Sequence, residues 1–338
     1  MGRKPTIHVI GTGGTISGAG DTATAAAYQS GRVDASQLIA AVDGLDNLAD
    51  VQTETLFATG SENLGPVQWC ELASRIEKLT RRADVDGVVV THGTDTLEEA
   101  AFFFDLVCRP TKPVALTAAM RPATALGADG PANLFQAALS VISPQLLQGG
   151  GVFVVMNTQV IAGWQAIKTD SVALESFCAY PGGPVGRIVG DNLIVIGGRK
   201  SSPIAGRFHD VLENDKDLPV VDIIALRGGC DDRPLSNMNN SDCKGLVIAG
   251  FGAGTMPEPL AAKAAALARS GTVVVVSSRV GRVTVLPDTM TPDAADGIIP
   301  SGFLNPQKSA LLLSLALASG LDALEIAGLF QLFSAQSQ

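Results

Sequence analysis

Two short apolar runs in this chain each end in a turn rich in glycine and threonine. Residues 7–10 precede Gly11-Thr12-Gly13-Gly14-Thr15-Ile16, and residues 88–90 precede Thr91-His92-Gly93-Thr94-Asp95-Thr96-Leu97-Glu98-Glu99. In an α/β sheet, ligands bind beyond the carboxyl ends of the strands, where such turns lie. We therefore expect both turns to contribute to one site.

Strand-like and helix-like stretches alternate through the first half of the chain. The strand-like runs are residues 7–10, 87–90, 114–117 and 152–156, and the helix-like stretches are residues 69–79, 97–107 and 133–141. Within the second helix, Leu97, Ala101, Phe104 and Cys108 recur at helical spacing, which predicts one buried face. This alternation predicts a parallel sheet with helices on both faces.

A polar segment, residues 197–218, interrupts this order, and a similar alternation resumes after it. We expect strands at 221–226, 246–249 and 273–276 and helices at 260–270 and 310–319, with Gly271 and Gly320 suited to end the two helices. A length of 338 residues fits two domains. The predicted fold class is α/β, with a larger N-terminal catalytic domain (1–198), a linker (199–218) and a smaller C-terminal domain (219–338). Each domain is expected to have a largely parallel sheet flanked by helices.

Composition excludes several classes of partner. The net charge is −9 and no Lys/Arg cluster exceeds Arg81-Arg82, so the basic footprint of a nucleic-acid-binding protein is missing. No apolar run approaches the ~18–20 residues of a membrane span, and no secretory signal pattern opens the chain. We predict a cytoplasmic protein without nucleic-acid or membrane partners. A periplasmic protein whose signal had been removed would have the same sequence.

Metal and histidine chemistry are also disfavoured. The five cysteines are odd in number and lack metal-ligand spacing, and the three histidines, at positions 8, 92 and 209, lie far apart. Only His92 is near a candidate site, so a Ser-His-Asp apparatus is improbable. We expect neither metal nor cofactor, and a base other than histidine.

The first turn admits more than one interpretation. It supplies two glycines of the dinucleotide fingerprint G-x-G-x-x-G, but Ile16 occupies the third position, which disfavours that reading. It is either a tight turn without a ligand or a turn whose glycines admit a ligand close to Thr15. A threonine hydroxyl is a nucleophile once a nearby group removes its proton. Tyr28, just downstream, is placed to transfer that proton or to act as a lid.

The second turn also fits two readings. Asp95-Thr96-Leu97-Glu98 matches a helix N-cap, with Glu98 and Glu99 at the positive end of the helix dipole. In this reading Asp95 is only a cap. In the other reading the turn contributes to the site, because capping does not account for the preceding His92-Gly93-Thr94. The two readings are compatible.

Residues 13–16 and 92–99 together resemble the two signatures of the bacterial L-asparaginase/glutaminase-asparaginase family, type II-like. Residues 119–124, 128–131 and 301–308 are similar to further family segments in the same order. The resemblance implies an amidohydrolase that converts L-asparagine to L-aspartate and ammonia, with lower activity on L-glutamine and without metal or cofactor. It also implies a homotetramer in which the C-terminal domain of one subunit completes a neighbour's active site.

The resemblance also implies roles for residues at matching positions. Thr15 would be the nucleophile that forms an acyl-enzyme, with Tyr28 assisting from a lid. Thr94, Asp95 and Lys168 would form a second catalytic set. Lysine replaces histidine as a base when burial or neighbouring charges lower its pKa. The alternative for Lys168 is an ordinary surface lysine.

Ser61 and Glu62, with Asp95, match the family's substrate-binding groups. Ser61 would donate to the α-carboxylate, and the two carboxylates would bind the α-ammonium. Two departures concern the wall that a neighbour would supply: Gly252-Ala253-Gly254 replaces the frequent Gly-Asn-Gly, and residues 281–288 lack the glutamate that often follows Ser277-Ser278-Arg279-Val280. We therefore predict that asparagine is preferred over glutamine.

Two alternatives remain from other classes. A non-catalytic amino-acid-binding protein on the same fold would bind aspartate and release no ammonia, but the catalytic residues are all present. An amidase acting on misacylated tRNA would require an RNA-binding segment, and the acidic sequence shows none.

Overall fold

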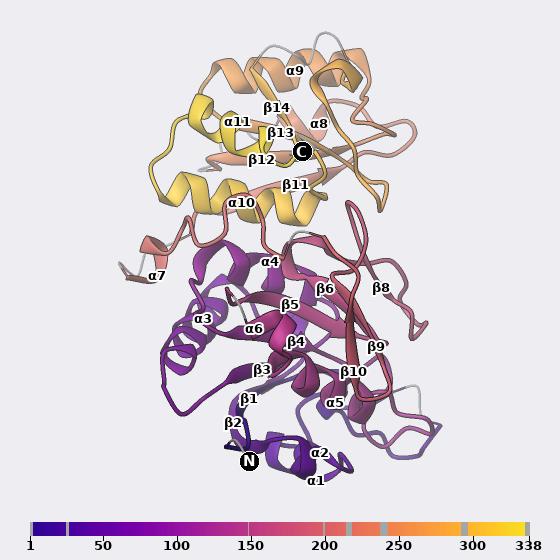
Figure 1. The fold of residues 1–338 in the computed structure, drawn as a ribbon. Helices are drawn as coiled ribbons and strands as arrows, with labels where there is room; N and C mark the ends of the chain where they lie inside the picture. Colours follow the sequence, from indigo (N-terminus) through magenta and orange to yellow (C-terminus); the bar gives the residue numbers. More distant parts are fainter. Residues whose placement is uncertain are drawn as a thin grey trace. The chain divides into compact units, whose positions relative to one another are not determined.

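The computed structural model describes residues 3–24, 27–147, 149–198, 200–213, 218–236, 243–291 and 297–334. The chain divides into two compact units, residues 1–209 and 210–338, shown in Figure 1. Of the predicted linker, residues 199 and 214–217 lie outside the described residues. The predicted two-domain α/β fold class is confirmed.

The first unit contains an eight-stranded sheet of order β10-β9-β6-β5-β4-β3-β1-β2. Its strands are β1 (Thr6–Gly13), β2 (Asp50–Thr59), β3 (Gly87–Thr91), β4 (Pro113–Thr117), β5 (Gly151–Met156), β6 (Gln159–Ala162), β9 (Gly186–Val189) and β10 (Asn192–Val195). The five strands from β2 to β5 are parallel, and β6, β9 and β10 add an antiparallel extension. All residues of β1, β3, β4 and β5 are buried, as expected for apolar strands covered on both faces.

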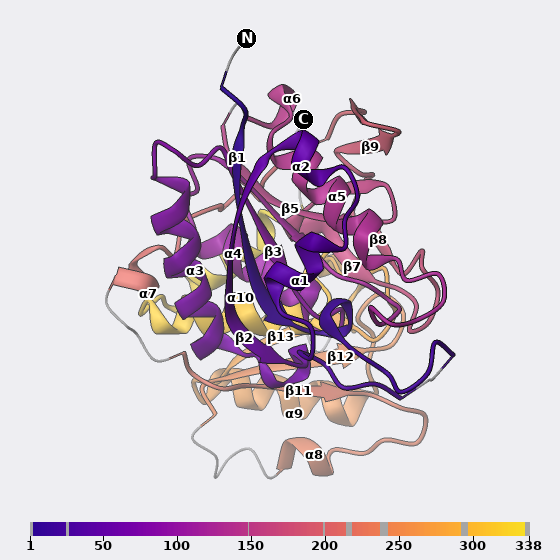
Figure 2. The ribbon, with the colours of Figure 1, turned by 90° about the horizontal axis from the view of Figure 1, so that it is seen from below.

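Helices cover both faces of this sheet. They are α1 (Ala35–Ala40), α2 (Leu45–Leu48), α3 (Pro66–Thr80), α4 (Leu97–Val107), α5 (Gly130–Val141) and α6 (Pro144–Leu147). Figures 1 and 2 show α3 and α4 over one face and α1, α2 and α5 over the other. A separate two-stranded sheet is formed by β7 (Ala166–Lys168) and β8 (Phe177–Ala179). Three 3₁₀ turns, η1 (Thr15–Ser17), η2 (Ser61–Asn63) and η3 (Gly163–Gln165), follow the ends of β1, β2 and β6.

Helix α4 is buried more completely than its sequence spacing predicted. Every residue from Leu97 to Val107 except Glu99 is buried. On one side Phe103 packs against Trp69 of α3, with ring centroids 5.8 Å apart. On another, residues 201–209 fold back onto the helix, where Phe208 N donates to Leu106 O at 3.0 Å. A second layer over the helix therefore replaces the expected single buried face.

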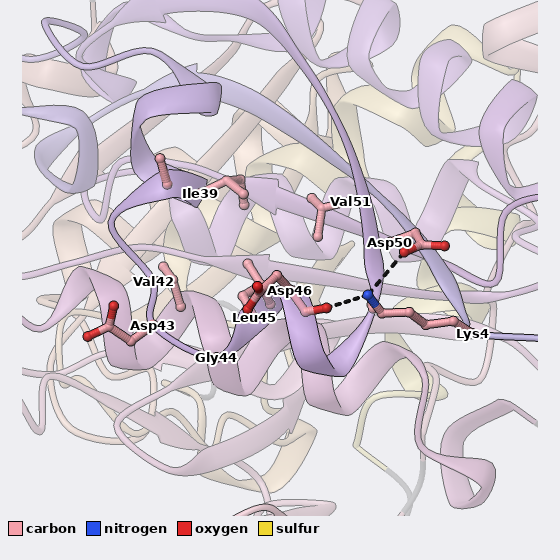
Figure 3. Close-up of a pocket in the computed structure, with 11 residues that line it drawn as sticks. Lys4, Ile39, Val42, Asp43, Gly44, Leu45, Asp46, Asp50 and Val51 are labelled. Carbon is pink, nitrogen blue, oxygen red and sulfur yellow. Dashed lines mark hydrogen bonds and ion pairs between the residues drawn. The ribbon is translucent and has the colours of Figure 1, made fainter.

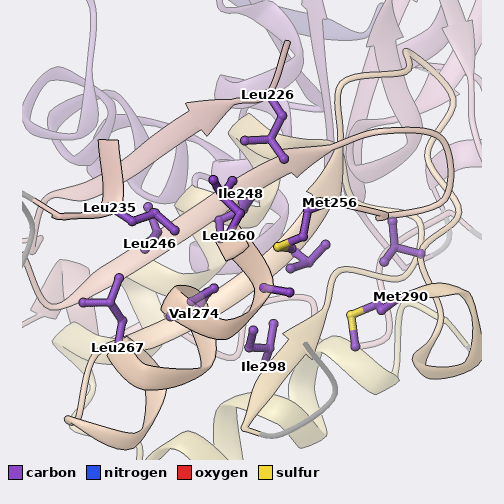
Figure 4. Close-up of a cluster of buried hydrophobic side chains, with 14 of the residues drawn as sticks. Leu226, Leu235, Leu246, Ile248, Met256, Leu260, Leu267, Val274, Met290 and Ile298 are labelled. Atoms are coloured by element: carbon purple, nitrogen blue, oxygen red, sulfur yellow. The ribbon is translucent and has the colours of Figure 1, made fainter. Parts of the chain in front are cut away.

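The second unit is a four-stranded parallel sheet of order β11-β12-β13-β14 with helices around it. The elements are α7 (Asp210–Glu213), β11 (Val221–Ala225), α8 (Arg233–Ser236), β12 (Gly245–Gly250), α9 (Glu258–Arg269), β13 (Val273–Ser278), η5 (Pro287–Thr289), β14 (Ile298–Pro300), α10 (Pro306–Ala318) and α11 (Ala323–Gln331). Side chains of α9, including Leu260 and Leu267, pack on Leu246, Ile248 and Val274 of the sheet (Figure 4). Each such fully buried side chain contributes about 1.5–3 kcal/mol to folding.

The two predicted helix-ending glycines are confirmed. Gly271 has φ +103° and Gly320 has φ +73°, values that favour glycine. After α9, Thr272 N donates to Leu267 O at 3.2 Å, and after α10, Leu321 N donates to Ala316 O at 3.2 Å. Both helices thus end in a Schellman motif that satisfies their last carbonyls.

In the part of the chain that the structure describes, no helix combines the length and apolar character needed to cross a membrane.

Candidate active site

The turns after β1 and β3 meet at the carboxyl edge of the sheet. Gly14 has φ +77°, and a Cβ atom built on it would lie 2.3 Å from Gly93 Cα. Gly13 has φ +106°, and its added Cβ would lie 2.1 Å from Thr59 O. Gly14 N also donates to Thr59 O at 2.8 Å. The two glycines are therefore required by the close packing of β1, β2 and β3 ends, rather than by a nucleotide phosphate.

This packing predicts a large stability difference between two glycine variants. Gly14→Ala places a methyl group within the main chain of Gly93, whereas Gly44, with a similar φ of +79°, has no atom within 4 Å of its added Cβ. We expect Gly44→Ala to lower the thermal midpoint by about 3 °C, through left-handed backbone strain alone. Gly14→Ala should lower it by about 10 °C or prevent folding. Equal midpoints for the two variants, measured by circular dichroism, would contradict this account.

Thr15 lies in η1 directly after this turn and is paired with Tyr28. The two hydroxyl oxygens, Thr15 Oγ1 and Tyr28 OH, are 2.6 Å apart. Thr15 is buried, while Tyr28 is 39% exposed. Ser17 links the segment that carries Tyr28 to the turn after β1. Its hydroxyl donates to Gly14 O at 3.1 Å and accepts from Gly31 N at 3.2 Å. An aliphatic hydroxyl and a phenol are thus held in direct contact.

Thr94, Asp95 and Lys168 form a second hydrogen-bonded set. Lys168 Nζ donates to Thr94 Oγ1 at 2.9 Å and to Asp95 Oδ1 at 2.8 Å. Lys168 is only 19% exposed at its side chain, whereas Asp95 is 64% exposed. Because the Asp95 carboxylate is solvated, the ion pair adds little stability and chiefly fixes the position of Lys168 Nζ. Lys168 is therefore not an ordinary surface lysine.

Ser61, just after the end of β2, holds the turn that leads into α4. Its Oγ accepts hydrogen bonds from Asp95 N at 3.2 Å and Thr96 N at 3.4 Å, and its carbonyl accepts from Thr96 Oγ1 at 2.9 Å. Both N–H groups precede the first residue of the helix, Leu97, so these bonds fix the turn after β3. The helix has no side-chain cap of its own. The reading of Asp95 as a helix cap is therefore wrong, since its side chain is bonded to Lys168 instead.

These groups surround one cavity of about 260 Å³. It is lined by Gly14, Thr15, Tyr28, Ser30, Gly60, Ser61, Glu62, Gly93, Thr94 and Asp95. Of the predicted site residues, only Lys168 does not line it, although its Nζ contacts Thr94, which does. Ser30 was not predicted, since its polar stretch carries no motif. The volume lies just below the range of about 300–1,000 Å³ that is usual for ligand pockets, and it suits a small polar molecule.

A second hollow lies elsewhere on the same unit. It has a volume of about 640 Å³ and is lined by the end of α1, the start of α2, the start of β2 and Lys4, which precedes β1 (Figure 3). Its cation, Lys4, is engaged by Asp46 O and by Asp50 Oδ1, the latter at 3.0 Å. No nucleophile paired with a base lines this hollow, so the smaller cavity is the better candidate active site.

His92 lies beneath the cavity and does not line it. Complete burial lowers its pKa to about 4, so the imidazole is neutral near pH 7. Its Nδ1–H donates to Gly93 O at 2.8 Å. Among the described residues, no group of three His, Cys, Asp or Glu side chains is placed to hold a metal ion. The cavity is lined by two threonine hydroxyls, a phenol and two carboxylates among other groups, and Lys168 contacts one of the threonines.

Hydroxyl nucleophiles with proton-transferring partners, at the carboxyl edge of a parallel sheet in a two-domain α/β chain, are typical of hydrolases. The family model described as "Asparaginase, N-terminal" matches residues 6–199, and "Glutaminase/Asparaginase C-terminal domain" matches residues 220–330. The chain belongs to this asparaginase family, as its motifs predicted.

Individual relatives align over nearly the whole chain. L-asparaginase 2 of Escherichia coli (strain K12) is 36% identical over 329 residues, which cover 96% of this chain and 92% of that protein. Glutaminase-asparaginase of Pseudomonas aeruginosa is 33% identical over 327 residues, 96% of this chain and 89% of its own length. The crystal structure of a probable cytoplasmic L-asparaginase from Campylobacter jejuni has a TM-score of 0.86 at 34% identity, covering 97% of this chain and 99% of that one.

Proposed function

We propose that this protein is an L-asparaginase that hydrolyses the side-chain amide of L-asparagine to give L-aspartate and ammonia. The observation that carries the proposal is the joint placement of the Thr15–Tyr28 pair and the Thr94–Lys168–Asp95 set around one small polar cavity. Membership of the asparaginase family and the names of the aligned relatives support it.

In the first half of the reaction, Thr15 Oγ1 attacks the amide carbon and its proton passes to Tyr28. A bond forms between Oγ1 and the carbon, and the carbonyl oxygen becomes an oxyanion that nearby backbone N–H groups stabilise. The oxyanion collapses, the carbon–nitrogen bond breaks, and ammonia leaves with the transferred proton. The aspartyl group is then held on Thr15 as an ester.

In the second half, water attacks the ester and frees Thr15. Lys168, bonded to Thr94, serves as the base for the water proton, which Thr94 relays. The bond between carbon and Oγ1 breaks, Oγ1 takes up a proton from solvent while Lys168 releases to solvent the proton that it accepted, and aspartate leaves. Asp95 orients the Lys168 amine throughout.

Ser61, Glu62 and Asp95 hold the substrate's backbone groups in this proposal. The Ser61 hydroxyl oxygen already accepts two N–H groups, so its own hydrogen remains to donate to the α-carboxylate. The carboxylates of Glu62 and Asp95 line the same cavity and pair with the α-ammonium. Ammonia release from L-asparagine by the purified chain tests the function. Binding of L-aspartate without any ammonia release would favour the non-catalytic binding protein.

We further propose that asparagine is preferred over glutamine. Ala253 lies where many family members place an asparagine, in a loop of the second unit pinned by hydrogen bonds from Ser278 Oγ to Gly252 O and from Thr289 Oγ1 to Ala253 O at 2.8 Å. Losing one polar anchor costs about 1–3 kcal/mol of binding or discrimination. We expect kcat/KM for asparagine to exceed that for glutamine by at least about 10-fold. Ala253→Asn should narrow this ratio, and comparable kcat/KM values in the wild type would refute the preference.

The assembly and compartment complete the proposal. We assign a homotetramer in which the C-terminal domain, residues 219–338 after the linker 199–218, completes the active site of a neighbouring subunit. Sedimentation analysis of the purified chain tests the tetramer. We assign the cytoplasm as the compartment, supported by the name of the C. jejuni neighbour, although an H. influenzae relative is named as periplasmic. Cell fractionation tests this assignment.

A further inference from the structure

Glu98 is a buried carboxylate beside the candidate active site that the proposed reaction does not use. It is the second residue of α4 and is 4% exposed. Its Oε2 accepts a hydrogen bond from the main-chain N–H of Lys168 at 2.8 Å. Burying a carboxylate is costly unless it gains strong hydrogen bonds. Its position therefore needs an explanation beyond the charge preference of a helix N-terminus.

Comparison with the next residue, Glu99, shows whether the helix dipole explains the burial of Glu98. Glu99 occupies the same first turn of α4 and carries the same charge, yet it is only half-buried. The helix dipole acts on both residues. Only Glu98 is turned into the protein toward β7. The dipole accordingly does not account for its burial, whereas the bond to Lys168 does.

The two ends of Lys168 are attached to one short segment of chain. Its Nζ contacts Thr94 and Asp95, and its main-chain N–H contacts Glu98, which lies three residues after Asp95 on the same turn. Lys168 itself is 70 residues away in sequence from Glu98. The distance between the amine and the Thr94 hydroxyl is therefore set through the Glu98 carboxylate as well as through the lysine side chain.

Lys168 has little other support from regular structure. It ends β7, a strand of three residues that pairs only with β8 in a two-stranded sheet. Hydrogen bonds to an ionised acceptor are roughly twice as strong as neutral ones. The Glu98 bond thus adds a direct tie between the main chain of Lys168, at the end of β7, and the first turn of α4.

We propose that Glu98 is the positioning residue of Lys168, and this rests on the proposed role of Lys168 as a base. Removing the acceptor lets β7 shift and moves the amine away from Thr94. A displacement of about 1 Å in a catalytic group costs up to about 100-fold in rate. We expect Glu98→Ala to lower kcat for asparagine by about 30-fold with little change in KM.

The conservative variant separates position from charge. Glu98→Gln keeps a carbonyl oxygen that accepts the Lys168 N–H, and it should retain kcat within about 5-fold of the wild type. Glu99→Gln, which removes the same charge from the same turn, is the matched control and should leave kcat unchanged. A Glu98→Gln variant as slow as Glu98→Ala would overturn the proposal, because charge would then be the determinant. Where Glu98→Ala does not fold, Glu98→Asp retracts the acceptor by one methylene and takes its place.

A second readout does not depend on turnover. Reductive methylation of lysines, followed by peptide mass spectrometry, reports how tightly each amine is held. We expect Lys168 in Glu98→Ala to be labelled several-fold faster, relative to exposed Lys78, than in the wild type or in Glu98→Gln. Unchanged labelling together with unchanged kcat would refute the proposal. Absence of ammonia release by the wild type would instead refute the proposed function, so the two failures are distinguishable.

Discussion

Thr15→Ala is expected to lower kcat for L-asparagine by at least about 10⁴-fold, because loss of the covalent nucleophile costs about 10⁶-fold in a serine hydrolase. The variant leaves no oxygen to form the acyl-enzyme and loses the hydrogen bond to Tyr28, whereas the hydrogen bonds of Ser61 and Lys168 do not involve Thr15. Binding of L-aspartate should be retained within about 10-fold, since the groups proposed to hold it are untouched. Steady-state ammonia release and aspartate titration measure the two quantities.

Thr15→Ser is the control for this experiment. It keeps the hydroxyl beside Tyr28 and removes only a methyl group, so it should retain measurable turnover. The ester on residue 15 is the second check: acid quenching during turnover should give a peptide containing Thr15 with the mass of an aspartyl adduct. An adduct on the peptide of Thr94, with normal turnover in Thr15→Ala, would exchange the roles of the two threonines.

The sequence predicted the parallel centre of the main sheet better than its margins. Strands β1, β3, β4 and β5 are continuous apolar runs, because both faces of each are covered. Strand β2 was not predicted, since it lies at the sheet edge and is mostly half-exposed, so its sequence of Asp50 to Thr59 is largely polar. The hairpin between β5 and β6 was missed for a different reason. Its turn uses Asn157 and Thr158 at φ +46° and +66°, without the glycine that normally signals such a turn.

The residues of the candidate site were predicted from sequence motifs. Such motifs do not reveal contacts between residues that are far apart in the chain. A strand-end threonine such as Thr15 is visible in the sequence because its turn is. The contact between Ser61 and the turn before α4 is not, because donor and acceptor lie 34 residues apart in the chain. The contact of Glu98 could not be predicted either, because the local sequence explains this residue only as an acidic side chain favoured by the helix dipole. Its bond to Lys168 depends on how β7 packs against α4, which no periodicity in either segment encodes.

Lys168→Met is expected to lower kcat by about 10³-fold, the usual contribution of a general base. Methionine fills a similar volume but cannot take a proton, so the Thr94 hydroxyl loses its partner at 2.9 Å. KM should change less than kcat, because Lys168 contacts Thr94 but does not line the cavity. Lys78→Met, at an exposed position on α3, is the control and should leave turnover unchanged.

Lys168→Arg distinguishes a base from a fixed positive charge. Arginine keeps a cation able to pair with Asp95, but its guanidinium remains protonated at every accessible pH and cannot accept a proton. If Lys168 moves a proton, the arginine variant should be nearly as slow as the methionine variant, at all pH values tested. If the arginine variant instead keeps most of the wild-type kcat, the residue acts by its charge alone. In that case Thr94 would stay oriented by a cation, and the proton would pass to another group in the cavity, of which Tyr28 is the nearest to Thr15.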